Sequence, residues 1–400
     1  MERTALPPRP DLETIAQEAG FVFHSMHGEP YWDETSAYAL TLEEVETRIE
    51  DPATELHAMC REAAAEIVGS QELLERLGIP PEHRDLVAGS WQAGDPELYG
   101  RFDLAYGGPG QEAAMLLEYN ADTPTSLYES AAFQWHWLED RIAAGVLPEG
   151  SDQFNRINEA LAERLAEIFA PGTDVHFTAF ADQVEDYATT EMIAWAAREA
   201  GLGAHFVDLP KIGITPSGQF ADDEDRVIGA LFKLYPWEDM LRDDFATHLA
   251  DSQCNFLEPP WKAVLSNKGL LPVLWRMFEG HPNLLPAFFA DELEAGGPAV
   301  ERARDRLEQG LVRKPIFSRE GASITISRGD ETIEAAADRS YDAHPMIVQA
   351  YQPLPAFDGM HPVIGAWIVG QDCVGMGLRE DRARITQDLS RFKPHYILAE

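Results

Sequence analysis

Cysteine is scarce in this 400-residue sequence and occurs at three positions that lie far apart, namely Cys60, Cys254 and Cys373. None of the three belongs to a CxxC pair, so their spacing fits neither a disulfide framework nor a zinc site. Few and isolated thiols are typical of a reducing compartment. We therefore expect a cytoplasmic protein.

Long apolar runs are missing as well. No stretch approaches the roughly 18 consecutive apolar residues that cross a bilayer. Residues 1–8 lack the apolar core of a secretion signal. The sequence thus predicts a soluble chain without a membrane partner. The proline-rich residues 1–10 are expected to form a loosely held arm.

Basic residues are few relative to acidic ones. Lysine and arginine total 31 against 69 aspartates and glutamates, which gives a formal net charge of −38. Such a surface repels nucleic acid and anionic membranes, so neither is an expected partner. It attracts cations such as polyamines, metal ions and basic peptides. Solubility in a salty cytoplasm is the alternative, and it accounts better for most of the charge because the acidic residues are spread along the whole chain.

Two common nucleotide-binding motifs are also absent. The Walker A pattern G-x-x-x-x-G-K-[ST] occurs nowhere in the chain, and no G-x-G-x-x-G follows a predicted strand. The sequence is therefore neither that of a P-loop protein nor that of a protein with a dinucleotide-binding fingerprint.

The apolar residues that are present follow helix and strand periods in turn. Strands alternate with helices from residue 174 onward, which favours a mixed α/β fold, and neither an internal repeat nor a low-complexity linker interrupts the chain. Helical spacing predicts helices over residues 11–19, 41–68 (with a break at Pro52), 71–78, 130–143, 153–169, 189–200, 237–249, 267–278 and 299–309. Strands are predicted over residues 174–180, 204–208, 227–234, 312–317, 324–327, 346–351, 363–369 and 373–378.

One predicted hairpin carries an unusual set of polar residues. The stretch Gly-Arg-Phe-Asp at 100–103 and the stretch Glu-Tyr-Asn at 118–120 flank a Gly-Gly-Pro-Gly turn at 107–110. Residues two apart in a strand share a face, so Arg101 lies with Asp103, and Glu118 with Asn120. Carboxylate and amide oxygens are ligands that Mg²⁺ accepts beside phosphates, and the arginine fork suits phosphate or carboxylate. A hairpin with a solvated polar face is the alternative.

Three further stretches place basic residues beside Gly or Ser turns. They are Ser-Asn-Lys at 266–268, Arg-Lys-Pro-Ile-Phe-Ser-Arg-Glu-Gly-Ala at 313–322, and Gly-Leu-Arg-Glu-Asp at 377–381. Cations and backbone N–H groups at such turns are able to form a phosphate cradle. Taken singly, each stretch is better explained by ordinary surface cations.

Taken together and in order, these stretches resemble the glutathionylspermidine synthase family. The resemblance rests on Gly-Arg-Phe-Asp, Leu-Glu-Tyr-Asn-Ala-Asp-Thr-Pro-Thr-Ser, Ser-Asn-Lys, Lys-Pro-Ile-Phe-Ser-Arg-Glu-Gly and Gly-Leu-Arg, and it runs from about Tyr31 to the C-terminus. It implies a permuted ATP-grasp fold that joins a peptide carboxylate to a polyamine through an acyl phosphate. Bifunctional members carry an additional amidase domain, and we expect this chain to correspond to the synthetase module alone.

The resemblance also implies roles for individual residues. Two Mg²⁺ ions and ATP phosphates would be held by the hairpin and the basic stretches, while hydroxyl and acidic residues would contact the substrates. The implied metal ligands are Asp103, Glu118 and Asn120. The implied ATP-binding residues are Arg101, Lys268, Lys314 and Gln349, and the implied catalytic residues are Arg101, Arg319 and Arg379. The implied substrate-binding residues are Thr123, Thr125, Ser126 and Glu185.

Two departures from the family pattern concern the acid substrate. Leu234 stands where the characterised enzyme has a small hydroxyl residue, and Ser126 stands close to the position of a cysteine that lies near the thiol of its peptide. Both changes affect the substrate set and leave the phosphate set complete. These changes bear against glutathione more than against ATP. The donor is expected to be a peptide or amino acid, and the acceptor a polyamine or another amine.

The implied organisation is an N-terminal arm and first helix over residues 1–30, followed by one module over residues 31–400. Within the module, residues 31–170 and 380–400 would carry the metal-binding hairpin, residues 171–260 would form a substrate lobe, and residues 261–379 a nucleotide-binding and lid lobe. A homodimer is one compatible assembly. Two other functions use the same cations: a nucleotide-binding regulatory protein without ligation, and an ATP-dependent small-molecule kinase.

Overall fold

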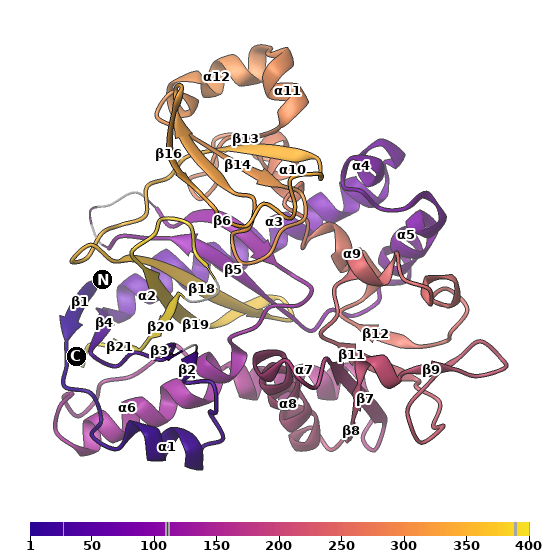
Figure 1. Cartoon of the computed structure of the whole chain (residues 1–400), viewed down its shortest axis with the longest axis horizontal. Helices are drawn as coiled ribbons and strands as arrows, with labels where there is room; N and C mark the ends of the chain where they lie inside the picture. Colours follow the sequence, from indigo (N-terminus) through magenta and orange to yellow (C-terminus); the bar gives the residue numbers. More distant parts are fainter. Residues whose placement is uncertain (27, 109, 111–112, 388–389, 400) are drawn as a thin grey trace.

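The computed structural model describes residues 1–26, 28–108, 110, 113–387 and 390–399. It confirms a mixed α/β fold with three larger sheets, of which one lies at the centre of Figure 1, one at the top and one at the lower right. The predicted turn at 107–110 includes Pro109, which lies outside the described residues. Among those that are described, no helix is long and apolar enough to span a membrane.

The first sheet is antiparallel and contains the predicted hairpin. Its strand order is β20-β19-β18-β5-β6, so strands from the end of the chain lie beside strands that begin at residue 99 (Figure 1). The lobe boundary expected between residues 379 and 380 falls inside β19, and residues 361–381 belong to the hairpin's sheet. The strands are β5 (Tyr99–Ala105), β6 (Met115–Asn120), β18 (His361–Val369), β19 (Asp372–Asp381) and β20 (Arg391–Lys393).

A long helical segment packs on one face of this sheet. It begins at α2 (Leu42–Val45), where Thr41 and Glu44 form the capping box that their spacing predicts. A π-helical turn over Glu46–Glu50 leads into α3 (Asp51–Val68). The expected break at Pro52 is wrong, because Glu50 and Asp51 keep right-handed helical backbone angles and the helix continues through the π-helical turn into α3. α3 contacts β18 and β19.

The second sheet is parallel and has the strand order β12-β11-β7-β8. The predicted strand–helix–strand unit is confirmed, with α8 (Val184–Glu199) crossing between β7 and β8 and packing on α7 (Ile157–Ile168). The strands are β7 (Asp174–Ala179), β8 (Gly203–Asp208), β11 (Ala230–Lys233) and β12 (Asn255–Leu257).

The helix expected over 237–249 is wrong. Only α9 (Trp237–Met240) and a 3₁₀ turn at Ala246–His248 form there. Between them, the Asp243 side chain accepts a hydrogen bond from the backbone N–H of Phe245 at 2.8 Å. Such a local bond offers the backbone an alternative to the helical ladder.

The third sheet lies across the hairpin, at the top of Figure 1, and has the order β13-β17-β14-β15-β16. Its strands are antiparallel, and α10, α11 and α12 pack around β13 and β17. The elements are α10 (Leu270–Met277), β13 (Ala287–Phe289), α11 (Ala290–Ala295), α12 (Pro298–Leu307), β14 (Leu311–Pro315), β15 (Thr325–Arg328), β16 (Glu331–Ala335) and β17 (Met346–Ala350).

The two ends of the chain meet in a small sheet. β4 (Ser36–Leu40) pairs with β1 (Glu2–Ala5) on one side and with β21 (His395–Ile397) on the other. The expectation of a loosely held N-terminal arm is therefore wrong. Two arginines fix the arm by ion pairs: Arg3 binds Glu380 at 2.9 Å, and buried Arg9 binds Glu34 at 2.5 Å.

The remaining elements are short helices and two small two-stranded sheets. They are α1 (Leu12–Glu18), β2 (Ser25–Met26), β3 (Glu29–Pro30), α4 (Gln71–Arg76), α5 (Arg84–Ala93), α6 (Gln134–Ala143), β9 (Gly213–Ile214) and β10 (Phe220–Ala221). The predicted helices at 11–19, 71–78 and 130–143 thus correspond to α1, α4 and α6, the last preceded by a π-helical turn at Glu129–Phe133.

Candidate active site

A cavity of about 260 Å³ opens between the three larger sheets. Its walls come from the hairpin, from β14, β15 and β17, from the first turn of α8, and from α9. Nearly all the site residues that the sequence predicts line this cavity, although they are spread over more than 270 positions of the chain. The lining residues from that set are Arg101, Asp103, Glu118, Asn120, Thr123, Thr125, Glu185, Lys268, Lys314, Arg319, Gln349 and Arg379.

The strand register of the hairpin brings its polar residues together as expected. Arg101 lies opposite Asn120, and Asp103 opposite Glu118. The Nε atom of Arg101 donates to Asp103 Oδ1 at 2.8 Å, while a guanidinium nitrogen of Arg379 donates to Asp103 Oδ2 at 3.1 Å. The two carboxylates therefore face one cavity from neighbouring strands, and two arginines orient one of them.

The alternate residues of the hairpin point into the core. Phe102 and Tyr119 stack with their ring centroids 4.0 Å apart, and the Tyr119 hydroxyl lies 3.0 Å from His57 Nδ1. On the cavity side, Gly365 of β18 lies opposite Asp103. A Cβ atom at Gly365 would lie only 2.8 Å from Cδ of Arg101. The glycine thus leaves the space that the arginine side chain occupies.

Two lysines approach the hairpin from the other wall. Lys268 Nζ lies 3.1 Å from Glu118 Oε2 and donates to the Ser318 carbonyl at 2.8 Å. Lys314 Nζ donates to the Leu117 carbonyl at 2.9 Å and to Gln349 Oε1 at 2.8 Å. The cavity therefore holds two ammonium groups that are both anchored to protein oxygens.

These charges shift one another's protonation equilibria. Burial alone would raise the pKa of Glu118, but Lys268 and Lys314 outweigh it and lower that pKa to about 2. Burial lowers the pKa of Lys314 to about 8, although Glu118 opposes this. An additional anion beside Lys314 would stabilise its charged form, so the cavity is electrostatically prepared for an anionic group.

A loop after β14 closes one side of the cavity. Arg319 from this loop donates to the Thr123 hydroxyl at 3.4 Å and lies 3.8 Å from Glu238. The Ser318 hydroxyl is buried and has no hydrogen-bond partner among the described residues. A buried polar group without a partner is costly, so this hydroxyl is an observation in favour of a ligand that binds there.

Three carboxylates form the opposite end of the cavity. Glu185 and Asp186 come from the first turn of α8, and Glu238 comes from α9. Burial raises the pKa of Asp186 to about 6, and burial also raises the pKa of Glu238, while Arg319 opposes both shifts. Sequence reasoning found only Glu185. Asp186 could have been found because it directly follows Glu185. Glu238 could have been found because it belongs to the Trp-Glu pair that follows Leu234.

Two residues singled out from the sequence lie away from the cavity wall. Ser126 is buried, at φ 69°, and its hydroxyl lies 3.4 Å from that of Tyr31. Contact between Ser126 and a substrate stays a prediction. Leu234 is also buried, 4% exposed, in a cluster with Phe177 and Phe232.

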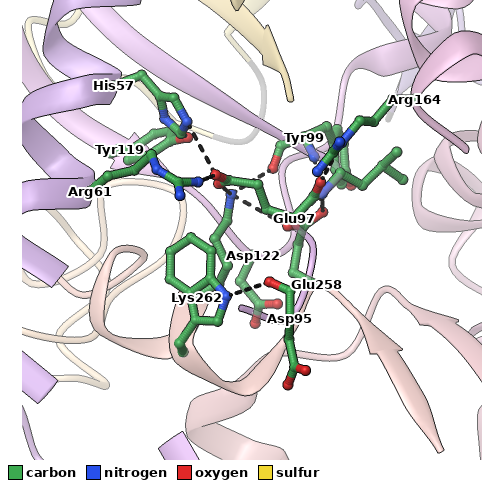
Figure 2. Close-up of polar contacts among 12 residues, drawn as sticks. His57, Arg61, Asp95, Glu97, Tyr99, Tyr119, Asp122, Arg164, Glu258 and Lys262 are labelled. Atoms are coloured by element: carbon green, nitrogen blue, oxygen red, sulfur yellow. Dashed lines mark hydrogen bonds and ion pairs between the residues drawn. The ribbon is translucent and has the colours of Figure 1, made fainter. Parts of the chain in front are cut away.

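A buried ionic network supports the back of the hairpin (Figure 2). Lys262 donates to Glu97 Oε2 at 3.0 Å and to the Tyr99 carbonyl at 3.1 Å, and it lies 3.4 Å from Glu258. Glu258 in turn accepts from the backbone N–H of Tyr99 at 3.0 Å. Figure 2 shows that Arg61 and His57 reach the same Glu97 carboxylate. The start of β5 is therefore held by two buried charged groups, Lys262 and Glu258.

The side chains of the hairpin fit the metal ion that the sequence implies. Asp103, Glu118 and Asn120 offer hard oxygen atoms from adjacent strands, and this chemistry fits Mg²⁺, which usually keeps several waters and phosphate ligands. No group of three or more His, Cys, Asp or Glu side chains with metal-site geometry occurs in the part of the chain that the structure describes. An apolar wall next to Gln349 fits a flat base, and it consists of Leu285, Val312, Ile324, Ile326, Leu354 and Val363.

Comparison with protein families decides the relationship. The model of the glutathionylspermidine synthase preATP-grasp family matches residues 3–398. The chain belongs to this family. A Haemophilus influenzae protein named "Putative acid--amine ligase" is 37% identical over 407 residues, covering 99% of each chain. Trypanothione synthetase of Crithidia fasciculata is 28% identical, and the match covers 83% of this chain. The same match covers 52% of that relative, so this chain spans about half of its length.

A solved structure supports the fold. A glutathione synthetase-like effector from Globodera pallida superposes with a TM-score of 0.56 and 13% sequence identity, covering 90% of this chain and 89% of that chain. At that identity the likeness concerns the fold alone. Together, the comparisons show a glutathionylspermidine synthase-family enzyme of the ligase class with an ATP-grasp-type fold.

Proposed function

We propose that this protein is an ATP- and Mg²⁺-dependent ligase that forms an amide bond between a carboxylate and an amine. The observation that carries the proposal is one cavity with two chemically different ends. Arg101, Arg379, Lys268 and Lys314 gather around the hairpin carboxylates at one end. Carboxylates of α8 and α9 line the other end.

The cationic end suits the transfer of a phosphoryl group. Lys268 and Lys314 would bind the ATP phosphates, and Gln349 would border the base beside the apolar wall. Asp103, Glu118 and Asn120 would hold Mg²⁺, which neutralises phosphate charge when bound. Arg101 and Arg379 would stabilise the charge that spreads over the transferred group, since such catalysis rests on positioning and electrostatics.

The chemistry proceeds in two displacements. A carboxylate oxygen of the acid attacks the γ-phosphorus, which breaks the bond to ADP and forms an acyl phosphate. The amine nitrogen then attacks the acyl carbon, and phosphate leaves with the former carboxylate oxygen. The amine must lose a proton on the way, and Glu185, Asp186 and Glu238 are the carboxylates placed to orient it and accept that proton. Thr123 and Thr125 would contact the acid.

The substrate classes follow from the two ends and from the family. The acidic end favours a cationic amine such as a polyamine, and the family name and the relatives' names indicate peptide–polyamine conjugates. For the acid, buried Leu234 and buried Ser126 offer no hydroxyl on the cavity wall. These two positions support an acid other than glutathione.

The test is ADP release by the purified protein with Mg-ATP and a panel of small peptides and amino acids against polyamines, other amines and ammonia. Ligation predicts that ADP appears only when acid and amine are both present, with a product equal in mass to acid plus amine minus water. A phosphorylated acid without an amide would contradict the proposal in favour of a kinase. Nucleotide binding without turnover for every pair would contradict it in favour of a regulatory protein.

A further inference from the structure

A second cavity, of about 320 Å³, lies in the parallel sheet and shares none of its lining residues with the first. Its floor consists of residues at the carboxyl ends of three neighbouring strands. They are Thr178 and Phe180 at the end of β7, Leu209 and Pro210 after β8, and Leu231, Lys233 and Tyr235 at the end of β11.

The strand order makes this a favoured position for a ligand. From β7 the chain passes through α8 to β8 on one side, and it later returns to β11 on the other side of β7. The connections thus diverge between β7 and β11. In open parallel sheets, ligands bind outside the carboxyl ends of the strands at such a switch point.

The wall of the cavity is mainly apolar and is open to solvent. Ile212, Phe220, Met240 and Leu249 form the inner part. Two aromatic side chains remain exposed, Phe180 by 39% and Phe245 by 43%. Concave sites with aromatic walls and a few polar groups are typical of small-molecule binding.

The charged groups define the ligand's charge. Lys233 is already neutralised, because its Nζ donates to Asp122 at 2.6 Å and lies 4.6 Å from the Trp237 ring centroid. Asp243 and Asp244 lie in the lining, and no lysine or arginine among the residues that the structure describes forms an ion pair with either. Neighbouring Arg242 instead donates to the carbonyls of Glu238 and Gly78. The uncompensated charge is negative.

We propose that this cavity is a second binding site, for a small molecule that carries an apolar or aromatic group and one cationic amine. The apolar group lies against Phe180, Phe220 and Phe245, and the ammonium group lies beside Asp244. The site is independent of ligation, but it adjoins the first cavity. Tyr235 and Met240 line the second cavity, and Glu238, which lies between them in the sequence, lines the first.

Isothermal titration calorimetry with three probes of one shape tests the site. The probes are 2-phenylethylamine, the neutral 2-phenylethanol and the anionic 3-phenylpropionate. The amine is expected to bind most tightly and the anion least. Phe245→Ala is expected to weaken binding of both the amine and the alcohol, and Asp244→Asn to weaken the amine alone by about two- to fivefold, as exposed ion pairs do.

Asp251→Asn is the matched control, because it removes the same charge from an exposed residue outside the lining. It is expected to leave the affinity for the amine unchanged. Equal affinities for the three probes, or equal effects of the Asp244 and Asp251 variants, would overturn the proposal.

The two cavities are told apart by Glu185→Gln. The Glu185→Gln variant is expected to bind 2-phenylethylamine in the second cavity as tightly as the wild type does. Saturating Mg-ATP is likewise expected to leave this affinity unchanged. Loss of binding in Glu185→Gln would place the probe in the first cavity and overturn the second site. Because binding is measured without turnover, failure of the ligase proposal would leave this result unaffected.

Discussion

Arg101 connects the hairpin to the rest of the first cavity. Its guanidinium group donates to Asp103 at 2.8 Å and to the Thr125 carbonyl at 2.6 Å, and it lies 5.7 Å from the Trp367 ring centroid. In the proposed reaction its partner is the transferred group. Arg101→Ala is therefore expected to abolish turnover while most of the nucleotide affinity remains. Normal turnover in this variant would leave the hairpin with a structural role alone.

Substitution of Lys314 is expected to have the opposite effect, a direct loss of nucleotide affinity. It is buried and anchored to Gln349 and to the Leu117 carbonyl, and the proposal places it on the ATP phosphates. Lys314→Ala is expected to raise the dissociation constant for Mg-ATP directly, by about 10-fold or more, because one charge-assisted hydrogen bond is lost. Equilibrium binding of a fluorescent ATP analogue to both variants separates the two roles. Unchanged affinity in Lys314→Ala would refute the assignment.

His395 offers a pH test of stability. The ring is fully buried, neither ring nitrogen has a partner among the described residues, and burial lowers its pKa from 6.5 to about 3. The unfolded chain therefore takes up a proton that the folded chain does not bind between these values. Stability is fully present above pH 6.5 and falls as the pH decreases toward 3, by about 1.4 kcal/mol per unit.

The matched variant is His395→Leu, which removes the titrating group. Urea unfolding at pH 7 and pH 5 is expected to show a loss of stability in the wild type that exceeds the loss in the variant by about 2 kcal/mol. The comparison cancels the other groups that titrate in this range. Equal losses in both proteins would show that His395 is charged, or hydrated, in the folded state.

At this scale the sequence predicts the hairpin well, because a strand period of two fixes which side chains share a face. It also links the basic residues in order, which pointed to Lys268, Lys314 and Arg379 in one cavity. It did not reveal Asp186 or Glu238, because their proximity depends on how α8 and α9 meet. Nor did it show that Ser126 is buried at a positive φ, outside the residues that line the cavity.

β18 contributes an interaction that sequence periodicity does not show. Gly365 leaves room for the Arg101 side chain, which a Cβ atom would approach to 2.8 Å. Gly365→Ala is expected to displace the guanidinium from Asp103 and to lower kcat strongly with little change in the dissociation constant for ATP. Gly213→Ala is the control, because no atom lies within 4 Å of a Cβ added there. A normal kcat in Gly365→Ala would show that the arginine adapts.

The ionic network behind β5 is expected to contribute to the free energy of unfolding. Lys262 is fully buried between Glu97 and Glu258. Lys262→Met leaves both carboxylates without this partner and is expected to lower the free energy of unfolding by about 3 kcal/mol or more. Arg61→Met, which removes a partner of Glu97 that is 35% exposed, is expected to cost about 1 kcal/mol or less. Equal costs in urea unfolding would contradict this difference.

Elements with strong local signals were predicted best. The capping box at Thr41 and the strand–helix alternation from residue 174 agree with the structure. The N-terminal arm was misjudged because its pairing with β4 and its ion pair with Glu380 are long-range. The helix predicted after Trp237 is wrong because the Asp243 side chain accepts a hydrogen bond from the backbone nearby, which competes with the helical pattern.

The charge of the whole molecule predicts a salt effect. With a net charge of −38, the folded chain repels itself over distances that salt screens. Raising NaCl from about 0.01 M to about 1 M shortens the Debye length from about 30 Å to about 3 Å. The melting temperature is therefore expected to rise across this range. A fall in melting temperature would indicate that specific ion pairs such as Arg9–Glu34 outweigh the general repulsion.

The order of the three sheets brings the two ends of the reaction together. The antiparallel hairpin sheet supplies the proposed metal ligands, the third sheet supplies Lys314 and Gln349, and the parallel sheet supplies the acidic end through α8. The chain order alone predicted an α/β class. It did not predict that residues 361–381 join the hairpin's sheet, because that pairing joins segments far apart in the sequence, such as Leu104 and Ile364.

Isotope transfer tests the central claim most directly. An acid that supports ADP release is labelled with ¹⁸O in both carboxylate oxygens and incubated with Mg-ATP and its amine. The proposed route predicts one ¹⁸O atom in the released phosphate and one in the amide, because the carboxylate oxygen that attacked phosphorus leaves with it. Phosphate that contains no ¹⁸O would contradict an acyl phosphate and, with it, the role assigned to Arg101 and its neighbours.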